Sequence, residues 1–236
     1  MIGIIGAMPV EIEGIRALLT ESETERFGGA VFCRGNLHGS DGSTVEAVSA
    51  VCGVGKVNAA LCAQAMILRY QPKLIINIGV GGGLLPDMRI GDIAVATAVV
   101  QHDFDTTPLG APRGYLSNLD CVEIPCAKEV VDPLTRAGRN VEGVCLYIGT
   151  IATGDQFIHD LRIKVSLADH FGAIACEMEG AGVGQACALL GTPFGVIRTI
   201  SDGANSRAAT DFSAFLEQTA ARSAALLAEC AGALAE

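Results

Sequence analysis

Short apolar segments of strand length alternate with helical segments along this chain, and this alternation limits its possible folds more than any other feature. Each strand segment is apolar at successive positions, as expected for strands that are covered on both faces. Strands alternating with helices predict an α/β fold in which a mixed, mostly parallel central sheet is flanked by helices. We expect strands at 2–5, 45–51, 74–78, 93–100, 144–151 and 194–200, and helices at 11–19, 56–70, 126–138, 160–170, 179–190 and 211–234.

No linker, low-complexity tract or internal repeat divides the sequence. Its 236 residues could form one large domain or two small ones, so length alone leaves the choice open. Half of the residues are apolar, which is enough for a large core, and 29 are glycines, which suit many tight turns. We therefore expect one domain over residues 1–236.

Charge and cysteine content exclude several classes of protein. The net charge is −10 and the Lys and Arg residues are scattered, so no basic stripe is available for a nucleic-acid partner. Residues 1–12 lack the basic start of a secretory signal, and the apolar stretches are too short to span a membrane. The nine cysteines include no Cys-x-x-Cys pair and no Cys/His pair at zinc-finger spacing. We expect a cytoplasmic protein with no disulfide framework, no metal and no membrane contact.

Two glycine-rich segments, Gly53–Val57 and Gly79–Gly83, each follow a predicted strand. The first differs from a phosphate loop because Val57 follows the lysine, where Mg²⁺ binding needs Ser or Thr. It also lacks the third glycine and the later acidic residue of a dinucleotide fingerprint, so we expect no cofactor. We interpret both segments as tight turns between strand and helix. The second would let the backbone approach a ligand closely at the carboxyl end of its strand.

Four acidic residues lie at predicted strand ends or just past them: Glu11, Glu177, Glu179 and Asp202. Glu177 and Glu179 would point to one face in extended geometry but would diverge in a helix, so only one of them need face a site. Taken singly, each acid is more often a helix cap or loop ligand than a catalytic group. Their convergence at one sheet edge favours a site there, whereas a Ser-His-Asp mechanism lacks its Gly-x-Ser-x-Gly turn.

Six short segments follow one another, over nearly the whole chain, in the order and at the intervals of one known family. They are Ile2–Met8 with Glu11, Cys52–Val57, Asn77–Gly79 with the glycines after it, Thr153–Ile158, Glu177–Ala181 and Arg198–Asp202. On these segments the chain resembles the methylthioadenosine/S-adenosylhomocysteine nucleosidases, a branch of the nucleoside phosphorylase superfamily. The resemblance implies hydrolysis of the N-glycosidic bond of both adenine nucleosides, with release of adenine and the 5-thio-substituted ribose.

Breaking such a bond passes through an oxocarbenium-like state, which needs an acid on the base, negative charge near the sugar and a positioned water. By the resemblance, Asp202 would protonate N7 of adenine and Ser201 would help to hold that acid. Phe157 would stack on the adenine ring, and the backbone of Ile158 would meet its polar edge.

The resemblance also implies the residues around the sugar. Glu179 would accept hydrogen bonds from the ribose hydroxyls, with Met178 packed on the sugar. Glu11 would orient and deprotonate the attacking water, and Arg198 would lie close to that water. Glu177 belongs to the expected substrate-binding set without a defined role.

A second subunit is part of the expected site. Val54 would line the pocket for the 5′-alkylthio group, together with Leu109 supplied by the neighbouring chain. Leu109 lies in the long loop 102–119, and loops of this length are usually functional or interfacial. The family therefore implies a homodimer, and its reaction belongs to methionine salvage.

The choice between hydrolase and phosphorylase depends on whether phosphate can be held. Phosphorylases of this superfamily place an Arg and a Ser around the segment that here is Asn77–Val80, and neither is present, which favours water as the nucleophile. Many nucleosidases have Ser where this chain has Val80, so one partner of the water is missing; Val80 and Gly81 complete the expected substrate-binding set. Aminofutalosine or another purine nucleoside as substrate, a purine nucleoside phosphorylase, and a purine-binding protein without catalysis stay open as alternatives.

Overall fold

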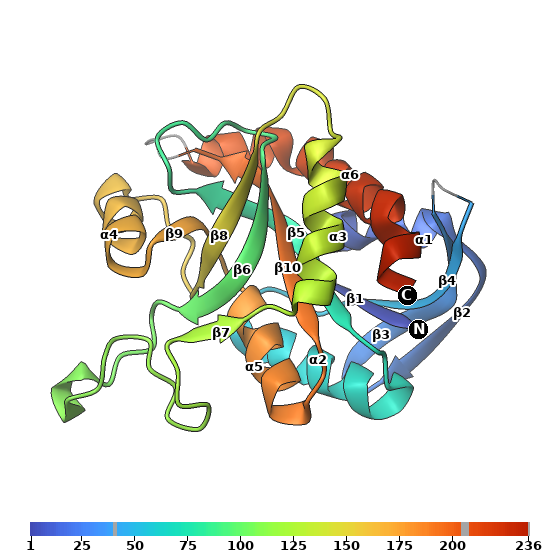
Figure 1. Cartoon of the computed structure of the whole chain (residues 1–236), viewed down its shortest axis with the longest axis horizontal. Coiled ribbons are helices and arrows are strands. Elements are labelled where there is room, and N and C mark those ends of the chain that lie inside the picture. The colour runs from blue at the N-terminus through green and yellow to red at the C-terminus, as the bar shows by residue number, and fades with distance from the viewer. Residues whose placement is uncertain (40–41, 204–207, 236) are drawn as a thin grey trace.

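A computed structural model of the chain describes residues 1–39, 42–203 and 208–235 (Figure 1). Its strands are β1 (Ile2–Gly6), β2 (Leu19–Phe27), β3 (Ala30–His38), β4 (Thr44–Val51), β5 (Ile75–Gly83), β6 (Ile93–Gln101), β7 (Glu123–Pro125), β8 (Leu146–Thr153), β9 (Ala173–Glu177) and β10 (Phe194–Asp202). Its helices are α1 (Pro9–Leu18), α2 (Lys56–Tyr70), the 3₁₀ helix η1 (Thr107–Leu109), α3 (Lys128–Arg139), α4 (Leu161–Phe171), α5 (Gly180–Leu190) and α6 (Ala208–Ala235).

All strands belong to one mixed sheet in the order β10-β6-β8-β9-β5-β1-β4-β3-β2, with β7 beside β6. Strand β5 also pairs with β10, so β5, β10, β6, β8 and β9 close into a ring. Parallel pairs join β1 to β4 and β5, β5 to β10, and β8 to β6 and β9. Antiparallel pairs are equally frequent among the described strands, because ring closure and the strands β2, β3 and β7 add them. The predicted single-domain α/β fold with a mixed sheet is confirmed.

Helices cover both faces of the sheet (Figure 1). On one face α2 and α5 lie side by side, and their small side chains, such as Ala59, Ala63 and Ala181, pack on the sheet in one apolar cluster. On the other face α1, α3 and α6 form a second cluster. Helix α4 lies at one end of the molecule, next to β9. Because both faces are covered, the central strands β1, β5, β9 and β10 are buried on both sides.

The predicted strands and helices are all present, with ends shifted by a few residues. The strands β2, β3 and β7 had no predicted counterpart, and β9, which covers the apolar run 173–176 ahead of Glu177, was not among the expected strands. The prediction of a turn at Gly79–Gly83 is wrong, because β5 continues through these glycines. Within the described residues, no helix has both the length and the hydropathy needed to cross a bilayer.

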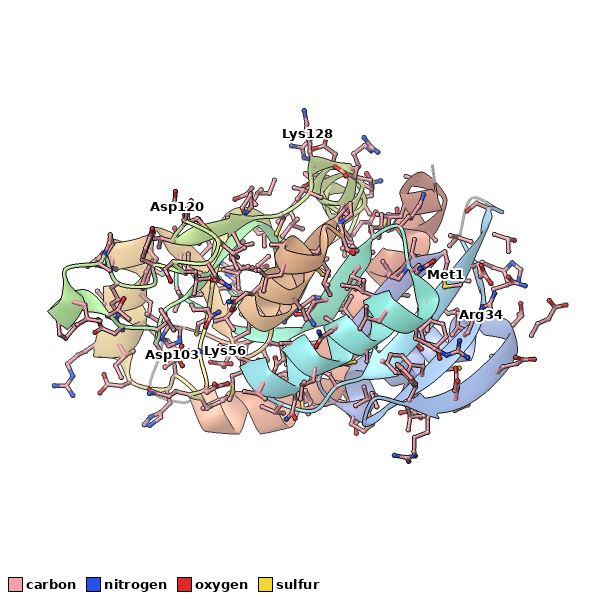
Figure 2. The ribbon with its side chains drawn as sticks, turned by 90° about the horizontal axis from the view of Figure 1, so that it is seen from below. Met1, Arg34, Lys56, Asp103, Asp120 and Lys128 are labelled. Atoms are coloured by element: carbon pink, nitrogen blue, oxygen red, sulfur yellow. The ribbon has the colours of Figure 1, made fainter. Side chains whose placement is uncertain are left out.

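The segment between β6 and β7 forms the long loop expected from the sequence, and it projects from the end of the molecule that carries α4 (Figure 1). Its base is fixed by an ion pair between Asp103 and Lys56, which starts α2 (Figure 2). Farther along the loop, Leu109 is 87% exposed. The loop is therefore anchored at one end and presents an apolar side chain to the outside at the other.

Candidate active site

A pocket of about 260 Å³ opens at the carboxyl ends of β1, β5, β9 and β10. This edge of a twisted α/β sheet is where ligands commonly bind, because side chains from several strand ends converge there. The pocket brings together every residue of the predicted site except Arg198 and Leu109: Glu11, Val54, Val80, Gly81, Phe157, Ile158, Glu177, Met178, Glu179, Ser201 and Asp202.

Glu11, on the first turn of α1, is buried at one end of this pocket. One carboxylate oxygen accepts hydrogen bonds from the backbone amides of Ala7 at 2.8 Å and Met8 at 2.9 Å, and the other accepts one from Val80 at 3.0 Å. Burial raises the pKa of Glu11, although the nearby Arg198 guanidinium and these amides act in the opposite direction. The carboxylate is thus held in place by backbone and is a stronger base than an exposed glutamate.

The glycine run of β5 makes room for two carboxylates. A Cβ atom on Gly79 would lie 2.5 Å from Glu11 Oε1, and one on Gly82 would lie 2.9 Å from Asp202 Oδ2. Any side chain at either position would push the acid away. The run is therefore part of a strand rather than a turn, and Gly79 and Gly82 are explained by the close approach of the two carboxylates.

Asp202 ends β10 at the other end of the pocket and is 2% exposed. Its Oδ2 atom accepts a hydrogen bond from the Lys164 ammonium at 2.8 Å, and its Oδ1 atom accepts one from the Ser201 hydroxyl at 3.0 Å. The pairing of β10 with β5 is irregular between Ile200 and Asp202. Such a bulge lets the consecutive residues Ser201 and Asp202 both reach the pocket, which regular alternation would prevent.

Glu177 and Glu179 have different environments, which answers the question that the sequence left open. Strand β9 ends at Glu177, whose carboxylate accepts hydrogen bonds from the amides of Glu179 at 2.9 Å and Gly180 at 2.7 Å, at the start of α5. It also accepts hydrogen bonds from the Thr153 hydroxyl and the Arg198 guanidinium. Glu177 therefore caps a helix and binds a buried arginine while one side of it lines the pocket.

Glu179 extends across the pocket to the turn before α2, where its Oε1 atom accepts a hydrogen bond from the amide of Gly55 at 2.8 Å. Burial, with a further contribution from the negative charge of Glu177, raises the pKa of Glu179 to about 7. The glycine turn at Gly53–Gly55 thus holds a carboxylate, and the prediction of a tight turn there is confirmed.

Arg198 lies behind the pocket wall rather than on it. Its guanidinium donates to Glu177, to the side chain of Asn77 and to the backbone oxygens of Asn77 and Ile197. Burial opposes the charge of Arg198, but Glu177, Glu179 and Glu11 outweigh it and raise its pKa. Arg198 therefore neutralises part of the acidic cluster from behind.

The mouth of the pocket is apolar. Val54 is 49% exposed and Phe157 is 42% exposed, whereas Ile158 is buried below them. Such a rim suits a flat aromatic group that slides between side chains. Leu109 does not line this pocket within the single chain.

A larger cavity of about 570 Å³ adjoins the pocket and shares Gln156 and Ile158 with it. It lies between α4 and the base of the long loop, and among its charged side chains Arg162 binds Asp160 and Asp103 binds Lys56. It contains none of the predicted carboxylates, so the chemistry points to the smaller pocket.

Comparison with known proteins identifies the family. A sequence profile described as the phosphorylase superfamily matches residues 1–232. The chain belongs to this superfamily. One superfamily relative, the 5′-methylthioadenosine/S-adenosylhomocysteine nucleosidase of Geobacillus thermodenitrificans, is 37% identical over 95% of this chain and 93% of its own length.

Solved structures of superfamily members agree with this placement. The 5′-methylthioadenosine/S-adenosylhomocysteine nucleosidase from Neisseria meningitidis, in complex with methylthio-immucillin-A, superimposes with a TM-score of 0.91 at 33% identity and covers 98% of both chains. A futalosine hydrolase of Helicobacter pylori superimposes with a TM-score of 0.89 at 35% identity, over 98% of this chain and 96% of that one.

Several pocket residues of this superfamily chain were not predicted from the sequence: Ala7, Met8, Gly82, Gln156 and Cys176. All but Cys176 lie inside the segments that carry the resemblance, and Cys176 directly precedes one of them, but none was assigned a role in the site. Lys164 was also missed, although it contacts Asp202. The sequence signal was a charged residue three positions before Leu167, on the same face of the predicted helix, and this face is buried.

Proposed function

We propose that this protein hydrolyses the N-glycosidic bond of 5′-methylthioadenosine and S-adenosylhomocysteine. The observation that carries the proposal is the placement of two carboxylates along one bare strand, Glu11 at Gly79 and Asp202 at Gly82. Three residues of extended chain span about 10 Å. That spacing accommodates a purine and a ribose between an acid and a base, and relatives with whole-chain similarity carry the name of this nucleosidase.

In the proposed reaction Asp202 is protonated in concert with substrate binding and gives that proton to N7 of adenine as the bond between C1′ and N9 breaks. The base leaves as neutral adenine, and the ribosyl group gains positive charge that Glu179 stabilises while it binds the hydroxyls. The oxygen of a water molecule attacks C1′ and forms the new bond between carbon and oxygen. The water gives a proton to Glu11. Phe157 and Ile158 would hold the base, Met178 the sugar and Val54 the 5′ substituent.

Water is favoured over phosphate by the charge of the pocket. Among the described residues that line it, three are glutamates and none is a lysine or arginine. The nearby Arg198 is already bound to Glu177 and Asn77, and Lys164 is bound to Asp202. A phosphate dianion would therefore meet negative charge without a free cationic partner.

The decisive assay measures adenine release in buffer free of phosphate. We expect full turnover there, with free 5-thio-substituted ribose as the second product. Strict dependence on phosphate, with ribose 1-phosphate formed, would replace the hydrolase with a phosphorylase. Asp202→Asn should lower kcat about 10²–10⁴-fold in protein shown by circular dichroism to be folded, because it removes the general acid. Asp87→Asn, at an exposed aspartate, is the matched control and should leave kcat unchanged.

Aminofutalosine is the second candidate substrate, because the Helicobacter pylori structure similar to this chain is a futalosine hydrolase. Both substrates present an adenine and a ribose to the same groups and differ at the 5′ end. We expect turnover of both, and a comparison of kcat/KM values on the purified protein determines which one is preferred.

We further propose a homodimer in which the long loop of one chain completes the pocket of the other. Val57 and Leu61 on α2 are 68% and 55% exposed, near Val54 at the mouth, and Leu109 is 87% exposed. Pairing would cover these apolar side chains. Light scattering should give twice the mass of the chain, and Leu109→Ala should raise KM for substrates with large 5′ groups. A monomeric mass with full activity would contradict the proposal.

We propose, finally, that residues 1–236 act as one nucleosidase domain in the cytoplasm, in methionine salvage. All nine cysteines are unpaired in the structure, which suits a reducing compartment. Cell fractionation and loss of growth on methylthioadenosine as sulfur source in a deletion strain would test the location and the pathway.

A further inference from the structure

We propose that Lys164 is a positioning residue for the acid: its ammonium fixes the Asp202 carboxyl group and stabilises the anion that remains once the proton has been given to the base. The inference rests on the proposed role of Asp202 and adds a residue that does not line the pocket.

Lys164 reaches Asp202 from a different part of the fold. It lies in the first turn of α4, 38 residues before Asp202, and its side chain is fully buried. Its Nζ atom donates to Asp202 Oδ2 at 2.8 Å and to the backbone oxygen of Gly203 at 2.7 Å. A lysine loses hydration and side-chain entropy in such a place, so it requires a charged partner.

The two oxygens of Asp202 have separate donors. Lys164 holds Oδ2, and the Ser201 hydroxyl holds Oδ1, while Gly82 leaves space beside Oδ2. A carboxyl group fixed at both oxygens keeps one orientation toward the pocket. Positional error of about 1 Å can cost about 10²-fold in rate, so this restraint bears directly on catalysis.

The charge of Lys164 has a second consequence. When Asp202 donates its proton to N7 it becomes a carboxylate, and the proton leaves with adenine. The ammonium 2.8 Å away stabilises that carboxylate by its positive charge. Lys164 therefore favours transfer of the proton from Asp202 to the base.

The other titratable groups around the pocket can be distinguished from this pair. Cys176 on β9 faces both Lys164 and Asp202, but burial raises the pKa of its thiol to about 12, so it stays neutral. Glu11 and Glu179 at the opposite end must be ionised to act, so they set the acid limb of the profile. The acid of the reaction must be protonated to act and sets the alkaline limb.

Three substitutions separate the effect of the hydrogen bond to Asp202 from the effect of the positive charge of Lys164. Lys164→Met removes both, Lys164→Gln keeps a donor without the charge, and Lys164→Arg keeps both. Arg162→Met, two residues away on α4, is the matched control because its side chain is 91% exposed. The measurement is the pH profile of kcat and kcat/KM for adenine release, with circular dichroism on every variant.

We expect Lys164→Met to lower kcat about 10²-fold with little change in KM. We expect the alkaline limb to move upward in both Lys164→Met and Lys164→Gln, because neither variant has the cation that stabilises the carboxylate left after proton transfer. Lys164→Arg and Arg162→Met should keep the limb of the parent protein. If Lys164→Met fails to fold, Lys164→Gln carries the same pH test.

An alkaline limb that stays in place in both neutral variants would overturn the proposal, as would a uniform loss of kcat at every pH, which indicates a purely structural role. The assay on Asp202→Asn distinguishes this failure from that of the proposed function. Full activity in Asp202→Asn would remove Asp202 as the acid. Loss of activity there, with unmoved limbs in the Lys164 variants, would remove only the lysine.

Discussion

The two ends of the pocket hold negative charge in opposite ways. At the sugar end, Glu11, Glu177 and Glu179 share a single arginine that lies behind the wall, and burial raises the pKa values of Glu11 and Glu179. At the base end, Asp202 has a buried ammonium of its own at 2.8 Å. One end therefore has an excess of negative charge, whereas the other is balanced.

This difference fits the chemistry proposed for each end. A ribosyl group that becomes positive is stabilised by uncompensated carboxylates, even though these carboxylates destabilise the empty protein. An acid that must become an anion is served by a fixed cation. Substitution of a carboxylate should therefore have opposite effects on stability at the two ends.

The largest effect is expected at the base end. Asp202→Asn leaves the Lys164 ammonium buried without its counter-ion, and removal of one partner from a buried pair costs about 3–5 kcal/mol of unfolding free energy. Urea unfolding at pH 7 measures this loss. The double variant Lys164→Met/Asp202→Asn removes the stranded charge and should recover much of it. Equal stability of Asp202→Asn and the parent protein would show that the Lys164 ammonium does not depend on Asp202 for its stability in the core.

At the sugar end we expect substitution of a carboxylate to stabilise the protein above neutral pH rather than to destabilise it. The pKa of Glu179 rises from its ordinary 4.5 to about 7 in the folded protein, so between these pH values the folded state binds more protons than the unfolded state. Stability therefore falls as pH rises through this window, by about 3 kcal/mol once pH exceeds 7. Glu179→Gln lacks this loss and can keep the hydrogen bond from Gly55.

Urea unfolding of Glu179→Gln and the parent protein at pH 5 and pH 8 tests this prediction. The difference between them should grow in favour of the variant at pH 8, whereas its activity falls. A stability difference that is the same at pH 5 and pH 8 would mean that burial does not raise the pKa of Glu179.

Much of the fold was predictable from sequence because continuous apolar strands and helical periodicity report burial directly. The strands β2 and β3 escaped prediction because β2 is largely exposed at the sheet edge and carries mostly polar side chains. The glycines of β5 were mistaken for a turn because glycine composition alone does not distinguish a bend from a close approach. Contacts of Gly79 and Gly82 with carboxylates come from distant parts of the chain and could not be read locally.

The site was predictable to the extent that its residues fall in local motifs. Glu11, Glu179 and Asp202 follow strands, so their convergence could be expected before any contact was known. The hidden position of Arg198 and the pairing of Lys164 with Asp202 could not, because each depends on side chains that meet across the fold. A lysine on a buried helix face was the one available sign.

The smallest expected effect concerns the water site between the two ends. The Val80 amide donates to Glu11 at 3.0 Å, but the Val80 side chain offers the attacking water no hydrogen bond. Val80→Ser adds a hydroxyl to the pocket wall beside Glu11, and one hydrogen bond is worth about 0.5–1.5 kcal/mol. We expect kcat to rise about 2–10-fold with KM nearly constant, because the bond would be made to the water rather than to the nucleoside.

Steady-state kinetics of adenine release in phosphate-free buffer measures this change in kcat, with Val80→Ala as the control for the lost volume. A gain shared equally by Val80→Ala would assign the effect to space, and an unchanged kcat in Val80→Ser would show that Glu11 alone positions the water.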